Sequence, residues 1–320
     1  MNADILAEWL RRQEYEVVRT PSSYWYKAGP RVWQAFPYHW LIEPTEKELH
    51  DLLLQNNAIA LRYSAPLSAS QGKVSYHIVC EDPEYDIASL SRRARQNIRR
   101  GNRYVQVEPI PLARLAEEGW RLRRDTLERQ GRLGAEHEDW WRRMCLSAQD
   151  LEGFEAWGAL HDGELVASFL AFTCDDRFTL PHEQSTTEHL SHRPNNAIYY
   201  AVTEQAIRRP DISGVFFCLH SLDAPASVDE FKLRMGLDAK PVRQRVVFHP
   251  LLAPLVNDMS HALIKSALSR NPSSATLAKA EGIVRFCLEG RMPAEAQDWP
   301  ECLNADKSAM LAAVQQIADA

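Results

Sequence analysis

The region from residue 154 to residue 249 combines apolar strand patterns with helical ones, and it constrains the fold more than any other part of the chain. Its first two apolar runs flank Asp162-Gly163. An Asp-Gly pair tolerates the positive φ that a tight turn requires, so this pattern predicts a β-hairpin. A further strand, a long helix, another strand, a short helix and a last strand are expected at 177–185, 193–208, 214–219, 231–236 and 242–249. The region thus predicts a mixed α/β domain.

The flanking regions predict a second α/β part and a helical tail. Thr45 and Glu48 have the spacing of a capping box at the start of a helix, and strands are expected at 58–63 and 74–80. The chain after Pro250 is mostly helical and carries no catalytic motif. It is expected to pack on the preceding part of the chain, the second lobe at 105–250, or to form a dimer contact. We therefore expect three parts, at 1–104, 105–250 and 251–320.

Bulk composition narrows the class of protein. A net charge of −6 over 320 residues argues against a general nucleic-acid coat. The 6 cysteines are scattered without a Cys-x-x-Cys pair, which indicates reduced thiols rather than disulfides or a zinc site. No apolar run reaches the roughly 18 residues of a membrane span. The N-terminus carries Asp4 and Glu8 and does not look like a signal peptide, so the cytoplasm is the expected compartment.

An arginine-rich helix is expected between residues 85 and 100. Leu90, Ala94 and Ile98 recur every four residues and form an apolar stripe, and Gly101 is expected to end the helix. The other faces carry several arginines, and three interpretations stay open. They form a solvated face, a clamp for an acidic substrate, or a contact for the phosphates of a lipid- or nucleotide-linked acceptor, for which the planar guanidinium is suited.

Several short stretches resemble FemAB-like acyltransferases of the GNAT superfamily. Residues 86–101 resemble the central helix of these proteins, with its Ser-x-x-x-Arg-x-x-Ile-Arg-Arg pattern. Residues 125–131 resemble the end of the following helix, and Leu165-Val166-Ala167-Ser168 and Phe231-Lys232-x-x-x-Gly236 complete the likeness. Their order and spacing cover the chain from about residue 85 to residue 249.

The resemblance implies an α/β (α+β) fold with two GNAT-like lobes, mixed and centrally splayed sheets, and a donor held between two splayed strands. It implies transfer of an acyl or aminoacyl group to an amine or hydroxyl of a small-molecule or cell-envelope precursor. Acyl-coenzyme A, or a related acyl donor, is the expected co-substrate. The alternatives are an aminoacyl-tRNA-dependent ligase acting on a peptidoglycan precursor, and an inactive GNAT-like binding module.

Two departures from the family bear on the donor. The pyrophosphate-binding loop of other GNAT enzymes, Arg/Gln-x-x-Gly-x-Gly/Ala, is absent, and residues 191–197 read Ser-His-Arg-Pro-Asn-Asn-Ala instead. The long charged coiled-coil arm of several tRNA-using members is absent as well. Because no cysteine stands in a recognisable basic setting, direct attack by the acceptor is favoured over a covalent intermediate.

The candidate catalytic residues are His182, Glu183, His220 and Lys232. His182 and Glu183 share one expected strand, where alternation places them on opposite faces, so one of them at most points into the cleft as a general base. His220 ends the strand 214–219 and is a second candidate base. Through the resemblance, Lys232 faces the cleft and stabilises developing charge or holds a phosphate.

The expected anion site lies at the start of the helix that follows Arg193. Exposed amides and the helix dipole there attract a phosphate, with Arg193, Asn195 and Asn196 as the cofactor-binding candidates. His189 and His192 are spaced like loop histidines without a supporting ligand pattern, so no metal is expected.

Overall fold

A computed structural model describes residues 2–132, 136–220, 226–272 and 274–318. The chain forms two compact units. The first comprises Met1–Glu14, Ile78–Cys218 and Ala226–Asp238, and the second comprises Tyr15–His77, Leu219–Pro225 and Ala239–Ala320. These units differ from the expected boundaries, because each one is assembled from segments that are distant in the sequence.

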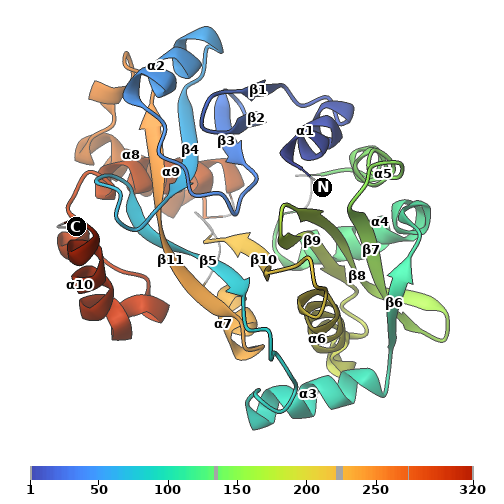
Figure 1. The fold of residues 1–320 in the computed structure, drawn as a ribbon. Coiled ribbons are helices and arrows are strands. Elements are labelled where there is room, and N and C mark those ends of the chain that lie inside the picture. Colours follow the sequence, from blue (N-terminus) through green and yellow to red (C-terminus); the bar gives the residue numbers. More distant parts are fainter. Residues whose placement is uncertain (1, 133–135, 221–225, 273, 319–320) are drawn as a thin grey trace. The chain divides into compact units, whose positions relative to one another are not determined.

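The first unit contains a sheet with the strand order β10-β9-β8-β7-β6, in which β6 to β9 are antiparallel neighbours and β9 and β10 are parallel (Figure 1). α4 packs against β8 and β9, and α6 packs against β7 and β8. The elements are α1 (Ala3–Arg12), α3 (Arg92–Asn102), β6 (Gln106–Ile110), α4 (Leu112–Arg129), α5 (Glu138–Leu146), β7 (Phe154–His161), β8 (Glu164–Cys174), β9 (Arg177–Ser185), η1 (Leu190–His192), α6 (Pro194–Ile207), β10 (Gly214–Leu219) and α7 (Ala226–Arg234).

The predicted hairpin joins β7 and β8. Asp162 and Gly163 have φ values of 49° and 82°, as the tight turn requires. Ten of the eleven β8 residues are buried, which explains why this strand reads as a nearly continuous apolar run. The hairpin prediction is confirmed.

Long-range contacts bring α1 into the first unit. The Trp9 ring lies 5.1 Å from the Phe154 ring and 6.2 Å from the Phe172 ring, measured between centroids. Its Nε1 donates a 3.0 Å hydrogen bond to the carbonyl oxygen of Met144. The N-terminal helix therefore packs on β7 and β8, which lie far from it in the sequence.

The arginine-rich helix α3 also belongs to the first unit, because it packs on α6. It begins at Arg92 with Ser91 as its N-cap, later than expected. It continues through Gly101 to Asn102, so Gly101 does not end the helix. Its buried residues are Ala94, Ile98 and Gly101, and its arginines lie on the remaining faces.

The second unit contains strands in the order β1-β2-β3-β4-β11-β5. Phe286 of α9 is fully buried in one hydrophobic cluster with Ala60 of β4 and Val246 of β11. The C-terminal helix α9 therefore shares a core with β4, from the N-terminal part of the sequence, and with β11. The elements are β1 (Val17–Arg19), β2 (Tyr24–Gly29), β3 (Val32–Phe36), α2 (Glu46–Gln55), β4 (Ala60–Ala65), β5 (Lys73–Cys80), β11 (Asp238–Phe248), η2 (Ala253–Leu255), α8 (Asp258–Arg270), α9 (Ala275–Glu289), η3 (Ala294–Ala296), η4 (Glu301–Asp306) and α10 (Lys307–Ala318).

The mixed α/β class is thus confirmed, with a mixed sheet in each unit and helices at the C-terminal end of the sequence. Within the described residues, no helix combines the length and the apolar character needed to cross a membrane.

Candidate functional site

The parallel strands β9 and β10 are paired only at their beginnings. The register joins Arg177 to Gly214, Phe178 to Val215 and Thr179 to Phe216. β9 then continues to Ser185 and β10 to Leu219, with no further pair between them among the residues that the structure describes. The two strands therefore separate after Thr179, and the splayed arrangement expected from the family resemblance is present.

A β-bulge in β9 lies where the strands separate. In the antiparallel pairing of β9 with β8, the register shifts between Leu170 and Phe172. Leu180 and Pro181 of β9 consequently face a single residue of β8. A bulge bends its strand and redirects the side chains that follow, and Pro181 suits this position because it has no N–H to donate to a regular ladder.

Glu183, Cys218 and Lys232 meet beyond the bulge and form what we call the Glu183–Lys232–Cys218 cluster. Nζ of Lys232 lies 3.5 Å from Oε1 of Glu183 and donates a 3.2 Å hydrogen bond to Sγ of Cys218. Glu183 comes from β9, Cys218 from β10 and Lys232 from the last turn of α7. The cluster thus joins the two separated strands to α7.

The Lys232 ammonium is buried and keeps its charge. Its side chain is 7% exposed, whereas the Glu183 side chain is 37% exposed. Burial by itself would lower the pKa of Lys232, but the Glu183 carboxylate, followed by Cys218 and Asp229, raises that pKa above its ordinary value. A buried ammonium of this kind stabilises negative charge that develops beside it.

The end of α7 is fixed by contacts within the first unit. The Phe231 ring meets the Tyr199 ring edge-on at 5.1 Å, and the Tyr85 hydroxyl donates a 2.7 Å hydrogen bond to the carbonyl oxygen of Met235. Gly236 has a φ of 79°, and a Cβ there would lie 2.4 Å from a Leu90 methyl group. Both the backbone conformation and the close approach require glycine, which explains the Phe-Lys-x-x-x-Gly spacing.

His182 lies on the other side of β9. Its ring contacts the rings of Trp140 and Trp141 edge-on, at 5.8 Å and 6.3 Å. Burial, and to a lesser degree the charge of Arg123, lowers the pKa of His182 to about 3. The structure therefore brings Glu183, but not His182, to Lys232, in agreement with the alternation of a strand.

His220 belongs to the second unit. Its Nδ1 lies 3.1 Å from Oγ of Ser75, and its ring stacks on Tyr76 at 4.4 Å between centroids. Its backbone N–H donates to the carbonyl oxygen of Tyr76. These contacts hold His220 against β5, and its role as a base stays a prediction.

The expected anion site at the start of α6 is packed against α3. A Cβ on Gly101 would lie 2.5 Å from the carbonyl oxygen of Arg193, so the two helices are in close contact there. Asn196 is buried, and its amide donates to Sδ of Met235 at 3.2 Å. Arg193 is exposed and Asn195 is partly exposed, so these two residues are the ones that can reach a ligand, and the anion site stays a prediction.

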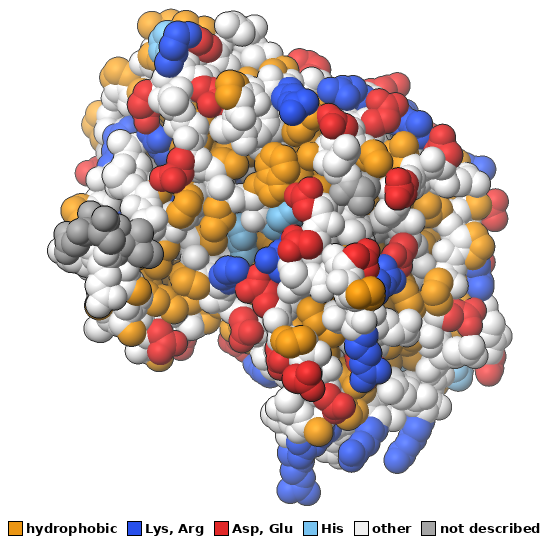
Figure 2. All heavy atoms as spheres, viewed as in Figure 1, with side chains coloured by type: hydrophobic (Ala, Val, Ile, Leu, Met, Phe, Trp, Pro, Cys, Tyr) orange, Lys and Arg blue, Asp and Glu red, His pale blue; other side chains and the backbone are white. Residues whose placement is uncertain are grey.

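The arginines of α3 form an exposed basic face. None of them has a carboxylate within 4 Å among the described residues, and a groove of about 740 Å³ runs along them. Basic side chains project at the place of α3, at the lower edge of the view (Figure 2). The groove is lined by Arg92, Arg95, Gln96, Arg99, Arg100 and Arg103.

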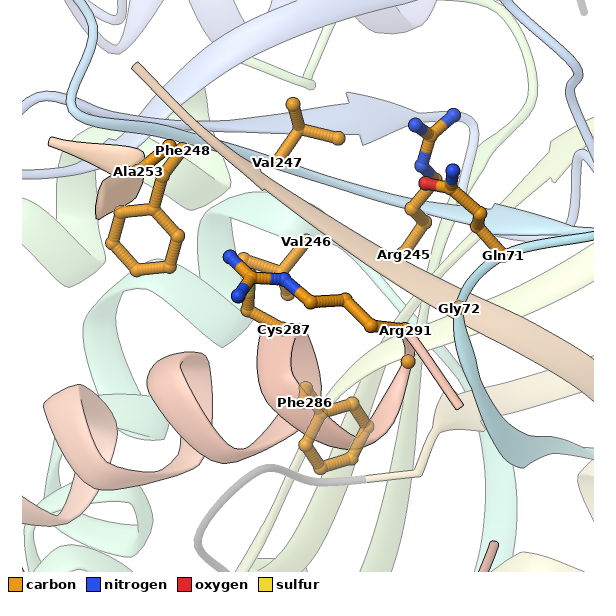
Figure 3. Close-up of a pocket in the computed structure, with 11 residues that line it drawn as sticks. Gln71, Gly72, Arg245, Val246, Val247, Phe248, Ala253, Phe286, Cys287 and Arg291 are labelled. Atoms are coloured by element: carbon orange, nitrogen blue, oxygen red, sulfur yellow. The ribbon is translucent and has the colours of Figure 1, made fainter. Parts of the chain in front are cut away.

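A second, smaller pocket lies in the second unit. The Arg291 side chain extends across it toward Val246 and Cys287, while the guanidinium of Arg245 points away from them (Figure 3). Its volume is about 140 Å³.

His189 and His192 surround a tyrosine. Oη of Tyr104 lies 2.7 Å from Nδ1 of His189, and the rings of His192 and His161 each stack on the Tyr104 ring at 3.8 Å. Among the described residues, no group of three His, Cys, Asp or Glu side chains is arranged to hold a metal ion.

Cys218 is a candidate site residue that the sequence did not predict. The expectation that no cysteine stands in a basic setting is wrong, because the Lys232 ammonium contacts its sulfur. The two residues are far apart in the sequence, and no motif links them. The one signal in the sequence is that side chains along β10 alternate between the two faces of the sheet. That signal identifies Cys218 only when the point at which β9 and β10 separate is already known.

Comparison with known proteins agrees with this geometry. Residues 88–223 match the family described as acetyltransferase (GNAT) domain. The fold resembles the C-terminal domain of a putative lysylphosphatidylglycerol synthetase from Agrobacterium fabrum, with a TM-score of 0.52 and 13% identity over 83% of this chain and 94% of that chain. It also resembles the crystal structure of FemX, with a TM-score of 0.51 and 10% identity over 74% of this chain and 90% of that one. No curated protein sequence matched.

Proposed function

Because residues 88–223 form a GNAT acetyltransferase domain within a FemAB-like fold, we propose that this protein is an N-acyltransferase of the cytoplasm. It moves an acyl group from acyl-coenzyme A, or a related acyl thioester, to an amine or hydroxyl. The acceptor is a small molecule or a cell-envelope precursor. The observation that carries the proposal is the separation of β9 and β10 at the Glu183–Lys232–Cys218 cluster.

The separated strands supply a place for the donor. Beyond Thr179 the β10-facing edge of β9 is released from pairing, so its backbone amides and carbonyls can pair with amide groups of a bound ligand. Thr179 itself has a buried hydroxyl without a hydrogen-bond partner in the described part of the chain. A buried polar group of this kind is costly unless a ligand or water satisfies it.

The cluster supplies the chemistry. Glu183 accepts a proton as the acceptor nitrogen or oxygen attacks the thioester carbonyl. Lys232 stabilises the negative charge that develops on the carbonyl oxygen. The carbon–sulfur bond of the donor then breaks, and its thiolate leaves with the proton that Glu183 took from the acceptor.

The basic face of α3 supports an acceptor that carries phosphate. Guanidinium groups bind phosphate oxygens in pairs, and the arginines here stand on a chain whose net charge is −6. This face also favours the second candidate function, aminoacyl transfer from a charged tRNA, because a row of arginines suits a phosphate backbone.

The test is a donor screen followed by product detection. Acyl-coenzyme A donors are screened by thermal shift, and each donor that raises Tm is incubated with cell extract and analysed by mass spectrometry. A second arm supplies charged tRNA, with transfer measured at several salt concentrations. Glu183→Gln is the test variant, and Glu230→Gln, which changes an exposed carboxylate on α7, is the matched control.

Each candidate function predicts a different result. Acyl transfer predicts that a thioester raises Tm and that Glu183→Gln lowers the rate. The tRNA alternative predicts product only from charged tRNA, with a steep dependence on salt. Absence of product in both arms, together with unchanged behaviour when His182, Glu183 and His220 are replaced at once, would identify an inactive binding module and end the proposal.

A further inference from the structure

Cys218 differs from the other thiols of the first unit. Cys80, Cys145 and Cys174 are buried, whereas Cys218 keeps exposed surface. It lies on β10 two residues past Phe216, the last residue that pairs with β9. The thiol therefore stands on the part of β10 that borders the separated strands.

The surroundings of Cys218 suit proton removal. Burial raises the pKa of the thiol, and the neighbouring Lys232 ammonium opposes this effect, so the resting group is the protonated thiol. Lys232 contacts both the Cys218 sulfur and the Glu183 carboxylate, at 3.2 Å and 3.5 Å. A proton can therefore pass from Cys218 to Glu183 through Lys232, which leaves a thiolate beside an ammonium.

We propose that Cys218 is the nucleophile that carries the acyl group from the donor to the acceptor, in a site formed by Glu183, Lys232 and Cys218. This inference rests on the proposed acyl transfer and specifies its route. In the first step the acyl group passes from one sulfur to another, so one carbon–sulfur bond breaks and another forms. This step therefore needs no other co-reactant. The route replaces the direct attack of the acceptor on the donor, which the sequence favoured and which the one-step mechanism proposed above also uses. Glu183 and Lys232 keep their roles in proton transfer and charge stabilisation.

Acyl transfer through Cys218 takes two steps. In the first, Sγ of Cys218 bonds to the acyl carbon, the donor carbon–sulfur bond breaks, and the donor thiolate leaves with the proton that Cys218 gave up. In the second, the acceptor nitrogen bonds to the same carbon, the bond to Sγ breaks, and Cys218 recovers a proton from the acceptor. The sum is one thioester and one amine converted to one amide and one thiol.

The experiment uses the full chain and acetyl-coenzyme A, with a glycyl thioester as a second donor and no acceptor present. Samples are quenched at times shorter than one turnover and analysed by intact and peptide mass spectrometry. Neutral hydroxylamine, which removes thioesters but not amides, distinguishes an adduct on Cys218 from one on Lys232. We expect a hydroxylamine-sensitive acyl group on Cys218 that disappears when the acceptor found in the product screen is added.

Cys302 is the internal control, because it is the exposed cysteine and reports chemical acylation that the site does not catalyse. We expect Cys218→Ala to lower the transfer rate by about a hundredfold or more. Cys218→Ser, which keeps the shape, is expected to accumulate a stable ester. Thermal unfolding of both variants separates loss of the nucleophile from loss of the fold.

The failures are distinguishable. Product formation at the unmodified rate by Cys218→Ala, or acylation of Cys218 no faster than that of Cys302, would overturn the acyl-enzyme and leave the acyl transfer standing. Absence of both product and adduct with the thioesters and with charged tRNA would overturn the acyl transfer itself, and the covalent route with it.

Discussion

Lys232 and Glu183 share an ion pair of 3.5 Å in which one partner is buried and the other is not. The lysine side chain is 7% exposed and the glutamate side chain is 37% exposed. Removing the glutamate leaves a charge inside the protein, whereas removing the lysine leaves a carboxylate that water still reaches. Replacing Glu183 and replacing Lys232 should therefore change the free energy of unfolding by different amounts.

We expect Lys232→Met to lower activity strongly while the fold persists. Methionine fills the space of the lysine stem, and an apolar replacement of a buried ion is often neutral for stability. Loss of the ammonium should lower kcat by about 10² to 10³. Arg234→Gln, on the exposed surface of the same helix, is the matched control and should stay within about 0.5 kcal/mol in urea unfolding. An active Lys232→Met protein would remove Lys232 from the mechanism.

Glu183→Gln should destabilise the protein more than Lys232→Met does. It leaves the Lys232 ammonium buried with Cys218 as its hydrogen-bond partner and with Asp229 as a more weakly interacting carboxylate. Loss of the stronger carboxylate partner of a buried charge costs roughly 1 to 3 kcal/mol. The measurement is the free energy of unfolding in urea for both variants at pH 7. Equal free energies of unfolding for the two variants would contradict the expectation that the more buried partner, Lys232, depends more on its ion pair.

Gly101→Ala should lower stability through the contact between α3 and α6. The added Cβ would lie 2.5 Å from the carbonyl oxygen of Arg193 and 2.8 Å from Cβ of Ala197, and both neighbours are held in α6 or at its start. Overpacking of this kind costs about 1 to 3 kcal/mol, although alanine is otherwise the better helix residue. Gly29→Ala, where no atom lies within 4 Å of the new Cβ, is the control. A more stable Gly101→Ala protein would show that the helices are not in close contact.

Local patterns predicted local structure well. The Asp162-Gly163 turn and the opposite faces of His182 and Glu183 follow from periods and turn residues within a few positions. The family resemblance located the short helix that carries Lys232, but this helix begins at Ala226 and ends at Arg234 rather than spanning 231–236. Gly101 shows the limit of such patterns. The sequence predicted that Gly101 ends its helix, but glycine is needed there because α6 approaches closely, and no local pattern contains that contact. The same holds for Cys218 and for the C-terminal helices, whose partners are chosen by long-range packing.

The basic face of α3 should determine binding of polyanions. We expect the combined variant Arg92→Gln, Arg99→Gln, Arg103→Gln to elute from phosphocellulose at lower salt than the unchanged protein, because each phosphate contact adds to the dependence on salt. Arg11→Gln, Arg208→Gln, Arg234→Gln removes the same charge elsewhere in the first unit and is the control. Identical elution of the two triple variants would show that net charge, rather than this face, governs retention.

His182 should make stability depend on pH in a defined window. Its pKa is lowered from 6.5 to about 3 in the folded protein, so the unfolded chain binds a proton that the folded chain rejects between these values. The neutral ring therefore supports the fold fully above about pH 6.5, and this support is lost as the pH falls toward 3. One such group gives a slope of about 1.4 kcal/mol per pH unit within the window.

We expect His182→Asn to flatten the fall in unfolding free energy between pH 6 and pH 4 by about that slope, measured by urea titration. His77 in the second unit, whose pKa burial also lowers to about 3, should give a similar flattening as His77→Asn. Parallel curves for His182→Asn and the unchanged protein would mean that the His182 ring accepts a proton in the folded state, and would restore it as a candidate base.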